Sequence, residues 1–163
     1  TDSFNRILPK LRKQYKNAIQ KPIVSYYEGI DGVKKVSEDI LEEKPKELKI
    51  FRSIYDSKRL KRFLDCHIKP KQKKLGINLK LISPAKITEE KKEKDKKWNR
   101  QRRYINAERF SLPSQINVYK DKVSILSLRK KPLGIIIENK DLAESLEKVF
   151  DALWSELGEK NDE

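Results

Sequence analysis

The sequence predicts an α/β protein with a mixed β-sheet flanked by helices on both faces and preceded by a separate N-terminal helix. Two observations carry this prediction. Short β-rich runs alternate with helical apolar spacing from residue 22 to residue 82, and a hairpin, a strand and a helix follow towards the end of the chain. This order is typical of an α/β layer, whose right-handed crossovers place helices on both faces of the sheet.

The first element, residues 4–20, is predicted to be a helix. Its apolar side chains recur at alternating spacings of four and three: Phe4, Leu8, Leu11, Tyr15 and Ala18. Pro9 allows a second start, in which the helix begins at the proline. Two interpretations of the stripe stay open: a coiled-coil seam, or an amphipathic helix packed on its own domain.

The next segment predicts strands at residues 22–28, 47–52 and 77–82. A helix after Gly29 carries a 3.6-residue stripe up to Pro45. A second helix presents Leu60, Phe63, Leu64 and Ile68 on one face, and Pro70 is expected to kink or end it.

The remaining elements are predicted in the same way. Residues 86–101 are nearly all charged, and the acids among the bases favour an exposed helix over a mobile insertion. Residues 104–110 alternate as a strand does, and residues 116–119 and 123–128 read as a hairpin. The near-continuous apolar run at 133–137 predicts a central strand buried on both faces. The last helix, after Asn139, carries the strongest stripe: Leu142, Leu146, Val149, Phe150, Leu153, Trp154 and Leu157.

The net charge of +14 comes from 39 Lys and Arg against 25 Asp and Glu, and it is concentrated in three runs: 6–21, 58–74 and 86–103. The segment from residue 138 onwards is acidic instead. A surface that binds nucleic acid and a highly charged, merely solvated surface both stay open as interpretations. The residues predicted to face nucleic acid are Arg12, Lys13, Lys16, Lys71, Lys73, Lys74, Arg102 and Arg103.

Composition also excludes several classes. No apolar run approaches the length of a membrane span, and no secretory signal is visible at the N-terminus. A single cysteine, Cys66, excludes an intramolecular disulfide and a cysteine-based zinc site, so a reduced, cytoplasmic location is expected. With five glycines, no Gly-rich loop and one histidine, we expect no cofactor and no metal. The chain does not begin with Met and is expected to be part of a longer protein.

An ordered set of motifs resembles a known family. It runs through Pro22, Tyr26-Tyr27-Glu28-Gly29 and Gly32, then Gly76-Ile77, Val118–Val123 with Ser127, Leu133–Glu138, and Val149-Phe150-Asp151 with Trp154. Over about residues 22–157 this set resembles the C-terminal domain of TrmB-type transcriptional regulators, in the branch whose effector half has a phospholipase-D-like fold. The resemblance implies a linker and dimerisation helix at 1–21, an effector domain at 22–163, a homodimer, a small-molecule effector, and DNA binding through an upstream winged helix-turn-helix that this chain lacks.

Phospholipase-D enzymes use the motif H-x-K-x4-D, with histidine as nucleophile and lysine on the phosphate. In this chain Asp121 stands at the aspartate position, whereas Ser114 and Ile116 replace the histidine and the lysine. His67 and Lys69 repeat the first half of the motif elsewhere, but Lys74 then occupies the aspartate position. We therefore expect that the chain is not an enzyme.

A framework without its reactive groups still has a cleft at its strand ends. The residues predicted to bind an anionic or hydroxyl-rich ligand there are Glu28, Arg52, Arg109, Ser114 and Asn117. The alternative is that Glu28 and Arg52 end adjacent strands and pair with each other.

The leading hypothesis is a non-catalytic effector and dimerisation domain of a transcription regulator. The alternatives are a stand-alone basic module that binds nucleic acid and, below both, a phosphodiesterase or nuclease with an unorthodox site.

Overall fold

The computed structural model describes the backbone of residues 2–20 and 22–161, and the side chains of residues 3–12 and 22–158. In chain order the elements are α1 (Asp2–Gln20), β1 (Ile23–Glu28), α2 (Gly29–Glu43), β2 (Glu47–Phe51), α3 (Lys58–Phe63), the π-helical turn η1 (Leu64–Ile68), α4 (Lys69–Lys74), β3 (Asn78–Ser83), α5 (Glu89–Lys97), β4 (Arg100–Tyr104), β5 (Ser114–Tyr119), β6 (Lys122–Ser127), β7 (Leu133–Glu138) and α6 (Lys140–Asn161).

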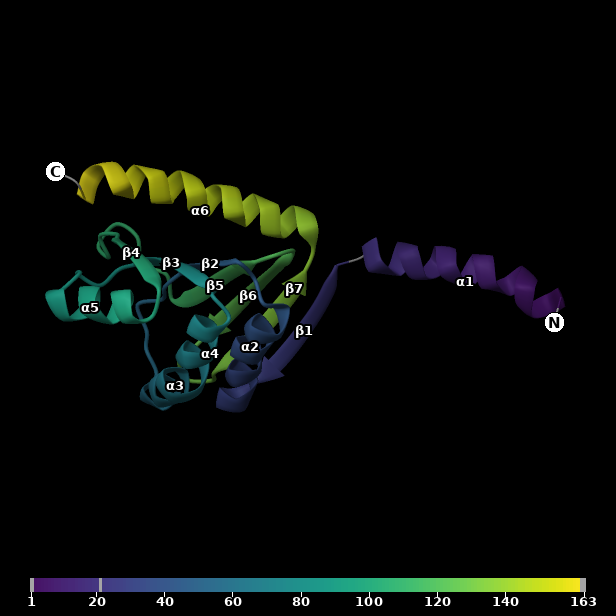
Figure 1. Cartoon of the computed structure of the whole chain (residues 1–163), viewed down its shortest axis with the longest axis horizontal. Helices are drawn as coiled ribbons and strands as arrows, with labels where there is room; N and C mark the ends of the chain where they lie inside the picture. The colour runs from purple at the N-terminus through teal and green to yellow at the C-terminus, as the bar shows by residue number, and fades with distance from the viewer. Residues whose placement is uncertain (1, 21, 162–163) are drawn as a thin grey trace.

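The strands form one seven-stranded sheet in the order β1-β7-β6-β5-β2-β3-β4. Strand β3 pairs in parallel with β2 and with β4, and every other pairing is antiparallel. Figure 1 shows α6 along one side of this sheet and α2, α3 and α4 on the other. The predicted α/β class, the mixed sheet and the helices on both faces are confirmed.

The face that carries α2 depends on a close approach between helix and sheet. The side chains of Val33 and Val36 are fully buried against Leu126 and Ile136. A Cβ on Gly134 of β7 would lie 2.6 Å from the Val36 side chain. A Cβ on Gly32 would lie 2.7 Å from the backbone of Tyr27. The two glycines therefore set the distance at which α2 rests on β1 and β7.

The opposite face is covered by α6. Phe150 is fully buried; its ring meets Phe51 edge to face at 5.1 Å and stacks on Trp154 at 5.6 Å. Beside this cluster the Lys49 ammonium lies 2.8 Å from both Glu147 and Asp151. Burial alone would lower the pKa of Lys49, but hydrogen bonds to the two carboxylates outweigh it and raise that pKa. The ion pairs of Lys49 with Glu147 and Asp151 thereby hold α6 against β2.

Strand β7 lies second from the edge of the sheet, not at its centre as predicted. Gly134 and Ile136 are buried under α2, whereas Ile135 and Ile137, which point to the other face, are only half-buried. The prediction of burial on both faces is wrong for this chain because α6 crosses the sheet further along. The neighbouring edge strand exposes Val24 and Tyr26 on that same face.

Two further predictions are corrected. The prediction of a strand at 104–110 is wrong, because β4 ends at Tyr104. Residues 107–109 form a turn in which the Asn106 side chain accepts a hydrogen bond from the Glu108 amide. The helix does not end at Pro70 but continues to Lys74, because the π-helical turn η1 shifts the hydrogen bonding and the Lys69 amide donates to Leu64, five residues back.

Helix α1 starts at Asp2 and contains Pro9, so the start at the proline is not used. Phe4, Ile7 and Leu11 are exposed along it. Leu8, another member of the predicted stripe, is half-buried, and the side chains of Tyr15 and Ala18 lie outside the described residues. The division into 1–21 and 22–163 stays a prediction.

Replacing Gly32 with alanine should destabilise the protein by about 1–3 kcal/mol, because the new methyl group meets backbone that cannot move aside. Urea unfolding would measure this change. The matched control is Glu38→Ala, at an exposed position of the same helix, with an expected change below about 0.5 kcal/mol. A Gly32 variant as stable as the control would show that the close approach is not rigid.

Candidate functional site

A hollow of about 720 Å³ opens where β1 turns into α2, beside the start of α3. Gly29 has a φ of 74°, which permits the turn, and its amide donates to the carbonyl of Pro132 at 2.7 Å. Ser57 begins α3 by accepting a hydrogen bond from the Leu60 amide. These two helix starts surround the hollow with charged side chains: Glu28, Asp31, Lys34, Lys58, Arg59 and Arg62. We call it the basic hollow.

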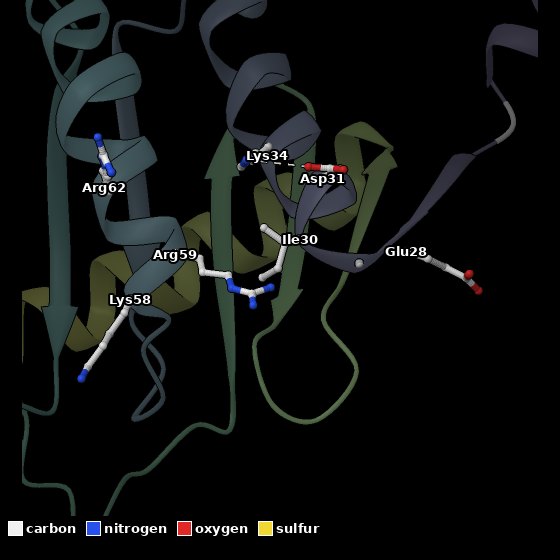
Figure 2. A pocket seen from close by; sticks show the side chains of 8 residues that line it. Glu28, Ile30, Asp31, Lys34, Lys58, Arg59 and Arg62 are labelled. Atoms are coloured by element: carbon white, nitrogen blue, oxygen red, sulfur yellow. Dashed lines mark ion pairs between the residues drawn. The ribbon is translucent and has the colours of Figure 1, made fainter.

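Positive charge dominates this hollow, with four cations against two carboxylates. Asp31 pairs with Lys34 at 3.7 Å and is otherwise open to solvent. Figure 2 shows Arg59 reaching across the opening beside Ile30, whereas Glu28 points away from the cations. An anionic group would be favoured here over a neutral or cationic one.

Of the five predicted ligand residues, only Glu28 lines the basic hollow, where it accepts a hydrogen bond from the Tyr26 hydroxyl at 3.0 Å. Arg109 is exposed in the turn after β4. Ser114 and Asn117, both on β5, point to opposite faces of the sheet. The five residues are therefore not brought together into one site.

The alternative pairing of Glu28 with Arg52 is wrong, because β7, β6 and β5 lie between β1 and β2. The Arg52 guanidinium instead reaches Asp56 at 2.5 Å and Gln115 at 2.9 Å. The prediction fails because the order of the strands along the sequence is not their order in the sheet.

Asn117 belongs to a row of buried hydrogen bonds that we call the polar ladder. Arg52 donates to Gln115, the Gln115 amide donates to Asn117 at 2.9 Å, and the Asn117 amide donates to the Ser124 hydroxyl at 2.9 Å. Gln115, Asn117 and Ser124 are all buried. Since the members satisfy one another, the ladder holds β2, β5 and β6 in register.

A second group extends this polar interior towards α2. The buried Tyr119 hydroxyl donates to Asp39 at 2.8 Å, and the Lys122 ammonium lies 3.1 Å from the same carboxylate. Burial and the Asp39 hydrogen bond raise the pKa of Tyr119, so it stays protonated and structural.

The residues predicted to face nucleic acid are spread over three elements. Lys71, Lys73 and Lys74 are exposed on α4, and Arg12 is exposed on α1. The side chains of Lys13 and Lys16 lie outside the described residues.

Two of the predicted nucleic-acid residues, Arg102 and Arg103, are engaged within the protein on opposite faces of β4. Arg102 binds both oxygens of Asp95, and Arg103 stacks over the Trp154 ring at 4.3 Å. The exposed lysines of α4 are therefore the better surface for a phosphate backbone.

Sequence reasoning placed Lys58, Arg59 and Arg62 in a basic run but not in a ligand site. The sequence does show that this basic run directly follows the Ser57 helix cap. Only the three-dimensional structure brings the run to the start of α2. The described residues contain no group of three or more His, Cys, Asp and Glu side chains that could hold a metal ion. None of the described helices is both long and apolar enough to cross a membrane.

No protein-family model and no curated protein matches this sequence. The fold is similar to that of TrmBL2, an archaeal chromatin protein whose structure shows a novel mode of DNA binding; the match has a TM-score of 0.54 at 12% identity and covers 94% of this chain. The chain spans 61% of the length of TrmBL2. NucT from Helicobacter pylori is also similar, with a TM-score of 0.57 at 11% identity, covering 83% of this chain and 97% of NucT. The chain therefore has a TrmB-like fold.

Replacing Asn117 with leucine should cost at least about 2 kcal/mol of stability, because the amide of Gln115 and the hydroxyl of Ser124 would each lose a buried partner. Ser114→Ala, half-buried on the other face of β5, serves as the control and should change stability by less than about 0.5 kcal/mol. Thermal unfolding of both variants would measure this. Equal stability of the two would contradict the structural role of the polar ladder.

Proposed function

We propose that this chain is the non-catalytic effector and dimerisation half of a cytoplasmic, TrmB-like regulator that binds DNA through a domain upstream of it. The observation that carries the proposal is the uncovered apolar surface on the α6 side of the sheet. Val24 and Tyr26 of β1 are 63% and 57% exposed, and Val149 of α6 is 56% exposed. Ile135 and Ile137 continue the same sheet face on β7.

A second copy of the chain is the partner that fits this surface. Strand β7 has the near-continuous apolar sequence of a strand covered on both sides, yet α2 covers only one of them. Exposed apolar side chains that gather on one face of a sheet mark an interface between proteins. The exposed apolar side chains of α1 add to the contact and would place the upstream DNA-binding heads as a pair.

The fold neighbours support the DNA-related part of the proposal, since TrmBL2 is a chromatin protein with a described mode of DNA binding. The absence of catalysis is proposed from the phospholipase-D resemblance. Ser114 stands at the nucleophile position, and Ile116, at the lysine position, packs against the core cluster around Phe51. Neither side chain supplies the imidazole or the ammonium that the chemistry needs.

The dimer is tested by light scattering after size-exclusion chromatography. The unmodified chain should elute at twice its mass of 19.3 kDa. The double variant Val24→Glu with Val149→Glu should weaken dimerisation at least about tenfold, because it places charge in a desolvated interface.

The matched control is Leu75→Glu, at an exposed leucine just after α4 on the opposite side of the sheet, which should stay dimeric. A chain that is monomeric at high concentration with α1 intact would contradict the proposal.

A second candidate function is direct binding of nucleic acid by this chain, favoured by the exposed cations of α3 and α4. Binding to a short DNA duplex should weaken steeply with salt. Changing Lys71, Lys73 and Lys74 to glutamine should make the slope of log affinity against log salt shallower by about 0.9 for each phosphate that is no longer neutralised. Lys130 and Lys131, changed to glutamine in the same way, are the control. Absence of binding at low salt would remove this candidate.

A further inference from the structure

Four cations gather on the side of the sheet that carries α4, close to strand β4. Arg100 and Arg102 come from β4, Arg52 follows β2, and Lys69 begins α4. We call them the cationic cluster. Burial and the charges of Arg102 and Arg52 lower the pKa of Arg100 to about 10. Burial lowers the pKa of Lys69 too, and the charges of Arg100 and Arg52 add to that effect. The side chains of Arg52, Lys69 and Arg102 are 25%, 18% and 14% exposed, so these charges lie in a poorly solvated place.

The side chains of Arg100 and Arg102 lie next to buried apolar side chains of the sheet. Arg100 and Arg102 are two residues apart on one strand, so both point to the same face. Their partners across the parallel pairing are Leu79 and Leu81, which are buried in the core. Their guanidinium groups therefore lie at the margin of the core rather than in open solvent.

Three of the four cations have a carboxylate of their own. Asp56 lies 2.5 Å from Arg52, Asp65 pairs with Lys69, and both oxygens of Asp95 accept from Arg102, at 2.9 and 3.1 Å. These carboxylates satisfy the cation that each one contacts.

Arg100 is different. Its Nε is shut off from solvent and, within the part of the chain that the structure describes, has no hydrogen-bond partner. Asp95 and Asp65 attract the Arg100 charge, but each is already bound to another cation. A desolvated guanidinium donor without an acceptor, surrounded by like charges, is costly to the folded protein unless an acceptor arrives from outside.

An acceptor has room to enter. Arg100 lines a hollow of about 410 Å³, whose other charged lining residues are Lys80, Lys96, Glu47 and Asp95. Lys80 is paired with Glu47 at 3.2 Å, and Asp95 is bound to Arg102. The planar fork of a guanidinium matches the oxygens of a tetrahedral oxyanion, and further cations nearby suit a dianion over chloride. The cluster carries one more positive charge than its three carboxylates neutralise.

We propose that Arg100, together with Lys96 at the same hollow, forms a binding site for a phosphate-type oxyanion. The source is either free inorganic phosphate or the phosphoryl group of a small phosphomonoester. This site is separate from the basic hollow, because the two share no lining residue.

The test is thermal unfolding of the full chain, with potassium phosphate replacing potassium chloride at constant ionic strength. At a phosphate concentration near 100 times Kd, the melting temperature of the unmodified chain should rise by about 5 °C. Arg100→Met should melt at the same temperature as the unmodified chain or higher without phosphate, because a poorly solvated charge is gone. The phosphate response of this variant should be lost. A purely structural arginine would give the opposite pattern: lower stability and an unchanged response.

Arg109→Met is the matched control, since it removes an exposed arginine that lines neither hollow and should keep the full response, whereas Arg59→Met tests whether phosphate binds in the basic hollow instead. If Arg100→Met does not fold, Arg100→Lys keeps the charge without the Nε, and titration calorimetry should show at least about tenfold weaker phosphate binding. Glycerol 3-phosphate distinguishes the two sources: tighter binding than inorganic phosphate identifies a phosphomonoester site, and weaker binding identifies a site for the free anion. Phosphate that stabilises no better than chloride, or a response that survives in Arg100→Met and disappears in Arg59→Met, would overturn the proposal.

Discussion

The width of one helix limits what it can cover on a seven-stranded sheet. A helix is about 10 Å across, and neighbouring strands are about 4.8 Å apart, so one helix shields about two or three strands. On the face fixed by Phe150 and Lys49, α6 is the described helix that packs, and it lies over β2, β4, β5 and β6 by crossing them obliquely. Strands β1 and β7 are not among the strands that α6 mainly contacts. Their apolar side chains on that face are left for another chain to cover, and the proposed dimer follows from this geometry.

The polar groups of the protein fall into two kinds. In the interior, Asn117, Gln115 and Ser124 satisfy one another, and Tyr119 is bound to Asp39, so these groups hold strands and helices in place. At the margins, the basic hollow and the cationic cluster around Arg100 present more positive than negative charge.

Much of the fold could be predicted from local patterns. The apolar stripe after Asn139, the hairpin around Lys120-Asp121 and the charged helix near residue 90 all formed as expected, because each depends on spacing within one segment. The order of strands could not be predicted in the same way. It depends on contacts between distant segments, so a pairing of Glu28 with Arg52 was expected although three strands separate them. The burial prediction failed at β7 because an apolar strand shows that both faces need cover, not that the same chain supplies it.

The site was predictable only in outline for the same reason. The basic run at 58–62 was visible, but its meeting with the start of α2 and the orphaned donor of Arg100 are consequences of packing.

Carbene footprinting of the full chain at high concentration tests directly whether a second copy covers the open sheet face. In a dimer, Val24, Tyr26 and Val149 should be shielded and become labelled on dilution, whereas Ile54 and Leu75, which are also exposed, should be labelled at every concentration. Labelling of all five residues in proportion to their exposure in the single chain, at every concentration, would contradict it.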